Sequence, residues 1–133
     1  MATLSLTNYL EGKLAEHVLR NVAYTPPTTL FVALHTADPT EAGNVAEVTT
    51  AAYTSYARKQ VTFNANSNGM CASAADISWN IDGAGVTIAH ISIWDSLSGA
   101  TNPLFYGPLN ASKTMANGEV FRIPAGSLSV GFD

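Results

Sequence analysis

The sequence is short of charge, of cysteine and of long apolar runs, and each shortage excludes a class of protein. Only 12% of the 133 residues are Asp, Glu, Lys or Arg, about half the usual share. The single cysteine, Cys71, excludes an intrachain disulfide, so the fold does not depend on an oxidising compartment. No run approaches the roughly 18 apolar residues of a membrane-spanning helix, and the N-terminus lacks the basic and continuous apolar regions of a signal peptide. We therefore expect a soluble protein without a signal peptide and without a membrane partner.

The few charges that are present argue against nucleic acid as a partner. Ten acidic and six basic residues give a formal net charge of −4, whereas phosphate binding needs clustered Lys or Arg. Only Arg58 and Lys59 are adjacent, and such a pair is typical of a solvated strand face. With hydrophobic residues at 47%, two interpretations stay open. The chain buries part of its surface against neighbouring subunits, or it is a neutral β-domain coated with Thr and Ser.

An amphipathic helix is predicted near the N-terminus, over residues 8–22. Asn8 can accept hydrogen bonds from the free amides of the first turn, and Glu11 three residues later completes a capping-box pattern. Apolar residues recur at helical spacing: Leu10, Leu14, Val18, Leu19 and Val22. Two roles for this stripe are open. It closes one end of the chain's own β-domain, which is the preferred interpretation, or it lies in a groove on a neighbour.

Short strands separated by turn residues follow the helix. Pro26 and Pro27 end the helical region, and the apolar run at 30–34 is typical of a buried strand that stops at the turn beginning with Asp38. Residues 86–94 form the strongest strand, apolar on both faces, and should lie at the centre of a sheet. Further strands are predicted at 55–63, 77–80, 104–109, 112–116, 119–123 and 127–130, and a turn at 95–99.

Two Asn-Gly pairs, at 68–69 and 117–118, match the two-residue hairpin turn in which both residues have positive φ. The second pair is predicted to join 112–116 to 119–123 as a hairpin. Strands at intervals of about 8–15 residues after one helix indicate a mainly β fold. We predict a single antiparallel β-sandwich, jelly-roll-like, that spans residues 1–133 as one domain.

No residues show a catalytic, metal or cofactor signature. His17, His35 and His90 stand outside any CxxC, HExxH or HxH arrangement. His35 and Asp38 come nearest to a ligand pair, although a structural hydrogen bond explains them more simply, and His90 is expected to be a satisfied core residue. There is no GxSxG motif, and Cys71 has no base near it in the sequence. We predict no catalytic, cofactor or metal residues, and a protein that is not an enzyme.

Aromatic side chains offer the remaining possible binding handle. Six of them could stack on a sugar: Tyr53, Tyr56, Trp79, Trp94, Phe105 and Tyr106. In a small β-domain such side chains usually form the core, and a sugar platform needs at least two of them exposed on one face. A carbohydrate-binding module is therefore the alternative function.

Four stretches, taken in order, resemble a known family. They read LTNYLEGKLAEHVLRN, TPPTTLFVALHTADPTEAG, SYARKQVTF and ISIWDSLSGATNPLFYGPLNASKTMANGEVFRIPAGSLSV, and the likeness runs from about Leu4 to Val130. The order is similar to that of a family of small tailed-bacteriophage virion proteins, labelled tail-fibre or head-decoration proteins. The resemblance implies a non-enzymatic structural protein of the virion, made in the host cytoplasm. It leaves open whether the protein decorates the capsid or belongs to the tail and fibres.

The implied partners are other virion proteins of the capsid or tail. The low charge favours contacts between subunits, and so does the Thr/Ala-rich segment at 48–53, which is expected to be an exposed loop or edge. We expect a homo-oligomer, with a trimer as the first choice because decoration proteins and fibres commonly lie on three-fold axes. Neither nucleic acid nor a membrane is an expected partner.

Overall fold

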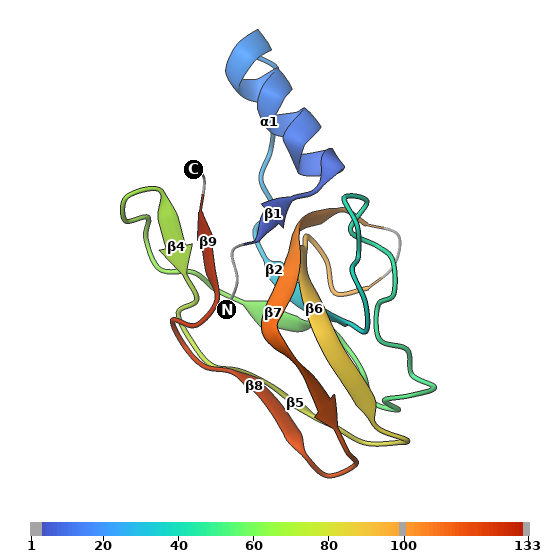
Figure 1. Ribbon diagram of the computed structural model, residues 1–133. Coiled ribbons are helices and arrows are strands. Elements are labelled where there is room, and N and C mark those ends of the chain that lie inside the picture. Colours follow the sequence, from blue (N-terminus) through green and yellow to red (C-terminus); the bar gives the residue numbers. More distant parts are fainter. Residues whose placement is uncertain (1–3, 99–100, 132–133) are drawn as a thin grey trace.

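The computed structural model describes residues 4–98 and 101–131, and it shows a β-sandwich from which one helix projects (Figure 1). Strands account for 40% and helix for 10%, so the mainly β class is confirmed. The elements in chain order are β1 (Ser5–Leu6), α1 (Asn8–Arg20), β2 (Leu30–His35), β3 (Lys59–Val61), β4 (Met70–Ala72), β5 (Ile77–Asn80), β6 (Val86–Trp94), β7 (Pro103–Met115), β8 (Val120–Ile123) and β9 (Ser129–Gly131).

One layer of the sandwich is a five-stranded antiparallel sheet in the order β1-β7-β6-β2-β3. β6 lies at its centre, between β2 and β7. The strand at residues 86–94 was predicted to be central because both of its faces are apolar, and this is confirmed. Ile88, Ile91 and Ile93 of β6 are fully buried.

The second layer consists of two two-stranded ribbons, β4–β9 and β5–β8. Trp79 of β5 and Phe121 of β8 lie with ring centroids 5.8 Å apart. They join Val32 and Leu34 of β2 and Ile91 of β6 in one apolar cluster, so the core lies between the two layers. This arrangement is compatible with the predicted sandwich, while the jelly-roll connectivity stays a prediction.

The prediction of a hairpin across Asn117-Gly118 is wrong. Residues 104–109 and 112–116, expected as two strands, belong mainly to the single long β7, which pairs with β6, whereas β8 pairs with β5 in the other layer. The intervening turn therefore crosses between layers. Gly118 has φ 91° and donates its N–H to the Ile81 carbonyl at 2.8 Å, but Asn117 does not have a positive φ. Long-range pairing overrides the local hairpin signal here.

The other Asn-Gly pair does form the predicted turn. Asn68 has φ 54° and Gly69 has φ 83°, and the flanking residues Ser67 and Met70 exchange backbone hydrogen bonds of 2.8 and 3.1 Å. Positive φ at both central residues is the geometry that matches the twist of a two-residue hairpin. The turn leads directly into β4, a strand that the sequence pattern did not predict.

Several predicted boundaries need correction. The strand expected at 55–63 shortens to β3, and β1 was not predicted at all. The segment 48–53 is not simply an exposed loop, because Val48 and Tyr53 at its two ends are buried in the core. A loop without regular pairing can still insert side chains into a sandwich, which strand periodicity does not register. The turn expected at 95–99 is described as far as Ser98, and Gly99 lies outside the described residues.

The helix is capped by Thr7 rather than by Asn8. The Thr7 hydroxyl accepts a hydrogen bond from the Leu10 amide at 3.3 Å and donates to the Pro103 carbonyl at 2.6 Å. This second, long-range bond selects Thr7 over its neighbour. The helix ends at Arg20, two residues earlier than predicted, where Asn21 takes a left-handed conformation with φ 57°. In the part of the chain that the structure describes, no helix is both long and apolar enough to cross a membrane.

Candidate functional site

His35 is held in a buried chain of hydrogen bonds. Trp94 donates its indole N–H to the Ser92 hydroxyl at 2.7 Å, and Ser92 lies 2.7 Å from Nε2 of His35. The indole N–H can only donate, so the Ser92 hydroxyl accepts from Trp94 and donates its own proton to Nε2 of His35. The other ring nitrogen of His35, Nδ1, then carries the proton and donates to the Val45 carbonyl at 2.8 Å. Every group is then satisfied with His35 neutral. Burial lowers the pKa of His35, in agreement with this assignment.

Beside His35 lies an ion pair between Arg58 and Glu47. The prediction that Arg58 lies on a solvated strand face is wrong. Arg58 is only 8% exposed, and its Nε and Nη2 donate to the two carboxylate oxygens of Glu47 at 3.0 and 2.9 Å. Its guanidinium carbon lies 3.8 Å from the centroid of the Trp94 ring. The alternation of apolar and polar residues along a strand cannot reveal this burial. Arg58 lies just before β3, so its side chain does not follow the inward and outward alternation of that strand. The adjacent Lys59 is exposed, as expected.

The Glu47 carboxylate is the acceptor at the centre of this cluster. Burial by itself would raise the pKa of Glu47, but the hydrogen bonds from Arg58 and from the Tyr56 hydroxyl outweigh it and hold the pKa below its usual value. Tyr56 donates to Glu47 at 2.6 Å and accepts from the Leu34 amide at 3.1 Å. Burial, together with the bond to Glu47, raises the pKa of Tyr56 above its ordinary range. Each of these three side chains therefore has a hydrogen-bond partner within the cluster.

The histidines do not form a metal site. His35 and His90 face each other across β2 and β6, but both nitrogens of His35 are already used. Asp38, the suggested partner of His35, instead accepts from the Thr40 amide at 2.8 Å. His17 bonds the Val22 carbonyl at 3.0 Å. Over residues 4–98 and 101–131, no group of three or more His, Cys, Asp or Glu is placed to hold a metal ion.

The expectation that His90 is a satisfied core residue is wrong. It is half-buried, and among the described residues its buried Nδ1 has no hydrogen-bond partner. The cross-strand neighbours of His90 are Pro108 and His35, and both ring nitrogens of His35 are already engaged.

The six aromatic residues considered for sugar stacking do not form an exposed platform. Tyr53, Trp79 and Trp94 are buried, and Tyr56, Phe105 and Tyr106 are half-buried. A stacking platform needs exposed ring faces. The arrangement lends no support to a carbohydrate-binding surface on these residues.

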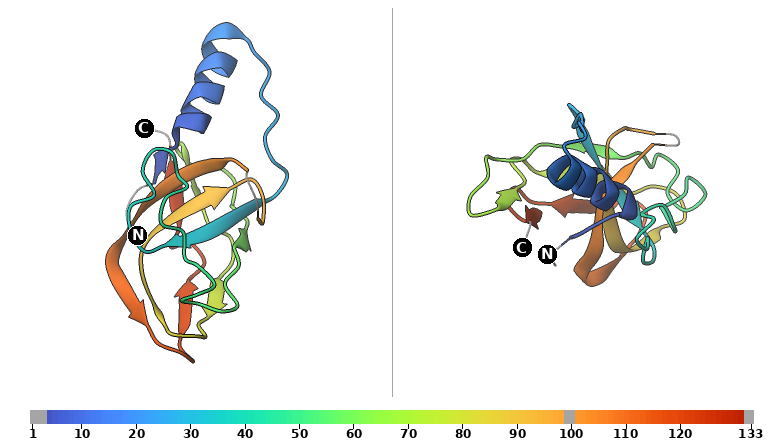
Figure 2. Two further views of the ribbon diagram at one scale, coloured as in Figure 1. Left: turned by 90° about the vertical axis from the view of Figure 1, so that its right-hand side faces the viewer. Right: turned by 90° about the horizontal axis from the view of Figure 1, so that it is seen from above.

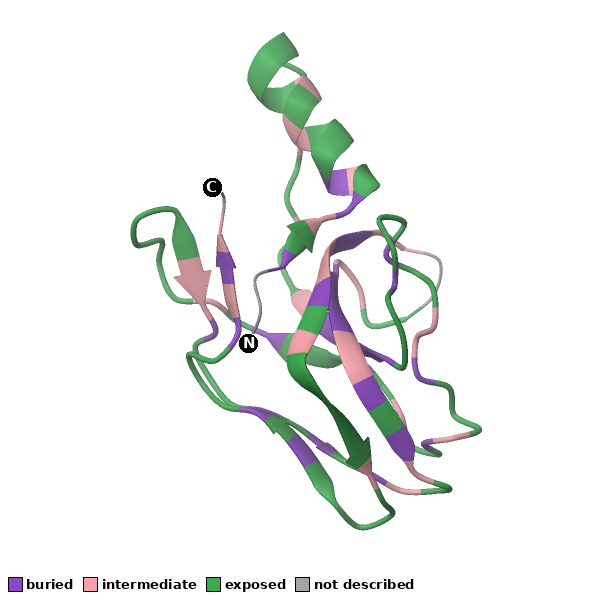
Figure 3. Ribbon diagram, in the orientation of Figure 1, coloured by how far each residue is buried: buried purple, intermediate pink, exposed green. Residues whose placement is uncertain are grey.

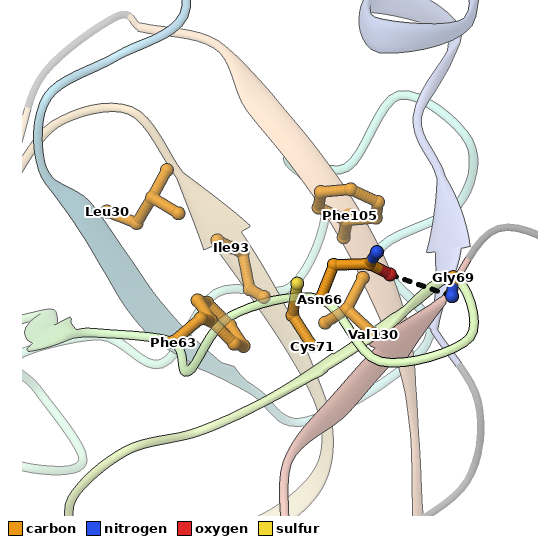
Figure 4. A pocket seen from close by; sticks show the side chains of 8 residues that line it. All are labelled: Leu30, Phe63, Asn66, Gly69, Cys71, Ile93, Phe105 and Val130. Carbon is orange, nitrogen blue, oxygen red and sulfur yellow. Dashed lines mark hydrogen bonds between the residues drawn. The ribbon is translucent and has the colours of Figure 1, made fainter.

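An open apolar cleft of about 500 Å³ lies where the β4–β9 ribbon meets the five-stranded sheet (Figure 4). We call this cavity the apolar cleft. Its lining residues are Leu30, Phe63, Asn66, Gly69, Cys71, Ile93, Phe105 and Val130. The Asn66 side-chain oxygen is occupied, because it accepts from the Gly69 amide at 2.7 Å. Cys71 lines the cleft as a half-buried free thiol.

The helix α1 and the extended segment 21–29 form an arm that stands off the sandwich (Figure 2). Only Leu10 of α1 is buried, whereas the arm exposes Val18 by 73%, Leu19 by 80% and Val22 by 46%. Figure 3 shows this contrast between the first turn and the rest of the helix. The preferred prediction, that the stripe closes the chain's own domain, is therefore wrong for Val18, Leu19 and Val22, while Leu14 is half-buried. We call Val18, Leu19 and Val22 the tip patch.

The direction of the arm follows from its attachment. β1 pairs with β7, and Thr7 continues this contact through its amide, which donates to the Leu104 carbonyl at 2.9 Å. The helix begins at the next residue and leads away from the sheet, and Leu10 in its first turn is its one buried residue. At the far end, the amides of Asn21 and Val22 both bond the Glu16 carbonyl, which gives the tip patch a defined shape.

Comparison with known families now adds the class of protein. The family model described as Podophage GP4 fiber I protein gp80 matches residues 5–131, and the chain belongs to this family. The description indicates a fibre protein of a tailed bacteriophage and supports a structural role in the virion, which confirms the resemblance found in the sequence. No curated protein matches the chain.

Proposed function

We propose that the protein is a single-domain, non-enzymatic subunit of the phage tail-fibre apparatus, and that it acts through the arm. The exposed tip patch carries this proposal. Three large apolar side chains exposed near the end of a projecting helix are costly to hydrate in an isolated protein. They become useful only when another subunit covers them.

The energetics favour a covered arm. Full burial of one exposed Val or Leu side chain contributes about 1.5–3 kcal/mol. Because the three side chains are 73%, 80% and 46% exposed, covering the tip patch contributes roughly 3–6 kcal/mol before the costs of association. The helix has only 13 residues, and helices of this length are marginal in water without packing. A neighbour that covers the patch would thus hold the arm in place and gain affinity from it.

The partners are other virion proteins, beginning with further copies of this chain, and the protein is made in the host cytoplasm before assembly. A trimer remains the first expectation for the homo-oligomer, and light scattering of the purified protein measures it directly. A monomer at all micromolar concentrations, together with no binding to particles that lack the protein, would contradict assembly through homotypic contacts.

Purified particles of the phage that encodes the protein test its place in the virion. We expect mass spectrometry to find the protein in the particles and immunogold electron microscopy to label the tail and fibres. Absence from the particles would contradict the proposal. Label spread evenly over the head, with hundreds of copies per particle, would replace the fibre role with capsid decoration.

A further inference from the structure

The tip patch and the apolar cleft match each other in chemistry. The side chains of Leu30 and Phe63 at the cleft are half-buried, and the structure gives the cleft no charged lining residue among those it describes. Near the tip patch, Glu16 and Arg20 pair with each other at 2.8 Å. Apolar surfaces of this kind can meet without stripping water from an unpaired charge, which is the usual obstacle to a buried contact.

The tip patch cannot fill the cleft of its own chain. The helix is fixed at its base by Thr7, and the segment that returns from its tip enters β2 at Leu30, which itself lines the cleft. The helix of 13 residues, at about 1.5 Å per residue, carries the tip roughly 20 Å from that base. Figure 2 shows that it leads away from the sandwich. Bringing the tip back to the cleft would require breaking the pairing of β1 with β7 or rearranging the segment 21–29.

We propose that the tip patch of one copy binds in the apolar cleft of a second copy. The inference rests on the proposed function and names the surface through which the subunits assemble. Each chain carries both surfaces, the tip patch at the far end of the arm and the apolar cleft where the β4–β9 ribbon meets the five-stranded sheet. Copies can therefore exchange arms reciprocally, or pass them around a closed ring, and cover every patch and every cleft. A second copy supplies both complementary surfaces at once, a patch for the cleft and a cleft for the patch.

The single cysteine provides a direct test, because Cys71 lies in the cleft. A Leu19→Cys variant places a second thiol in the tip patch. Treated with a short bis-maleimide cross-linker, it should form covalent oligomers in which peptide mass spectrometry finds residue 19 linked to Cys71 of another chain. Adding Cys71→Ser should abolish that linkage. A Val120→Cys variant is the matched control, since Val120 is also an exposed apolar residue, 52% exposed, but lies on β8.

Three measurements decide the outcome. We expect Leu19→Asp to remain folded by circular dichroism and to lose at least tenfold in self-association by light scattering, while Val120→Asp associates as the wild type does. No linkage between residue 19 and Cys71, or equal linkage from Val120→Cys, would overturn the inference. If the wild-type protein still associates and is found in particles, the proposed function survives that result, so the two failures can be told apart.

Discussion

The sandwich and the arm both carry large apolar side chains, but the sandwich buries them and the arm leaves them exposed. Ile88 at the centre of β6 is fully buried, whereas Leu19 near the end of α1 is 80% exposed. The sandwich covers its apolar faces because two layers close on each other. The arm has one buried side chain on its helix, Leu10, and its last turn leaves Val18 and Leu19 exposed. The difference separates residues that make the fold from residues available for contacts beyond it.

The largest expected effect is a cavity in the sandwich. Ile88→Ala removes fully buried atoms from the central strand and should lower the free energy of unfolding by about 3–4 kcal/mol. Urea titration measures the loss, and the exposed Val120→Ala on β8 should change stability by less than about 0.5 kcal/mol. Equal effects of the two substitutions would show that the sandwich core does not govern stability.

Breaking the buried ion pair should have the next largest effect. Glu47→Gln leaves Arg58 enclosed without its carboxylate partner, and we expect a loss of about 2–3 kcal/mol, at or below the usual range for buried pairs because the Glu47 side chain is 22% exposed. The matched control is Glu16→Gln on the arm, whose pair with Arg20 is largely exposed and contributes at most a few tenths of a kcal/mol. A larger loss in the control would reverse the comparison.

A smaller, graded effect should come from acidification. Burial lowers the pKa of His35 below 6.5, and His90 and Arg58 nearby also disfavour its charged form, while the hydrogen bond to the Val45 carbonyl and the charge of Glu47 oppose them. Below pH 6.5 the unfolded chain takes up a proton that the folded chain resists, so stability falls as the pH drops from 7 toward 5. His35→Gln should make this decline shallower in chemical denaturation followed across the pH range. An unchanged slope would remove His35 as its source.

The smallest effect on folding is expected at the tip. Leu19→Ser should change the free energy of unfolding of the isolated subunit by less than about 0.5 kcal/mol, because the side chain is already 80% exposed. Thermal unfolding of dilute protein measures this. A loss comparable to that of Ile88→Ala would mean that the tip patch packs against its own chain and would erase the contrast between arm and sandwich.

Much of the local structure could be predicted from the sequence. The helix, β5 and β6 follow from apolar periodicity, and the turn at Asn68-Gly69 follows from the need for positive φ at two successive residues. These features depend on short-range geometry, which the neighbouring residues carry. The matched stretches of sequence also identified the family, without any measure of how the strands pair.

Only the tertiary structure decided which strands pair and which apolar faces are covered. The two Asn-Gly pairs look alike in sequence, yet one closes a hairpin and the other crosses between layers, because β7 pairs with β6 and β8 with β5. The sequence predicts Arg58 on the surface, but in the structure it is enclosed by Glu47 and Trp94. The stripe on α1 is typical of a core face, but its last members on the helix, Val18 and Leu19, are exposed. Periodicity states that a face is apolar, whereas long-range contacts determine what, if anything, covers it.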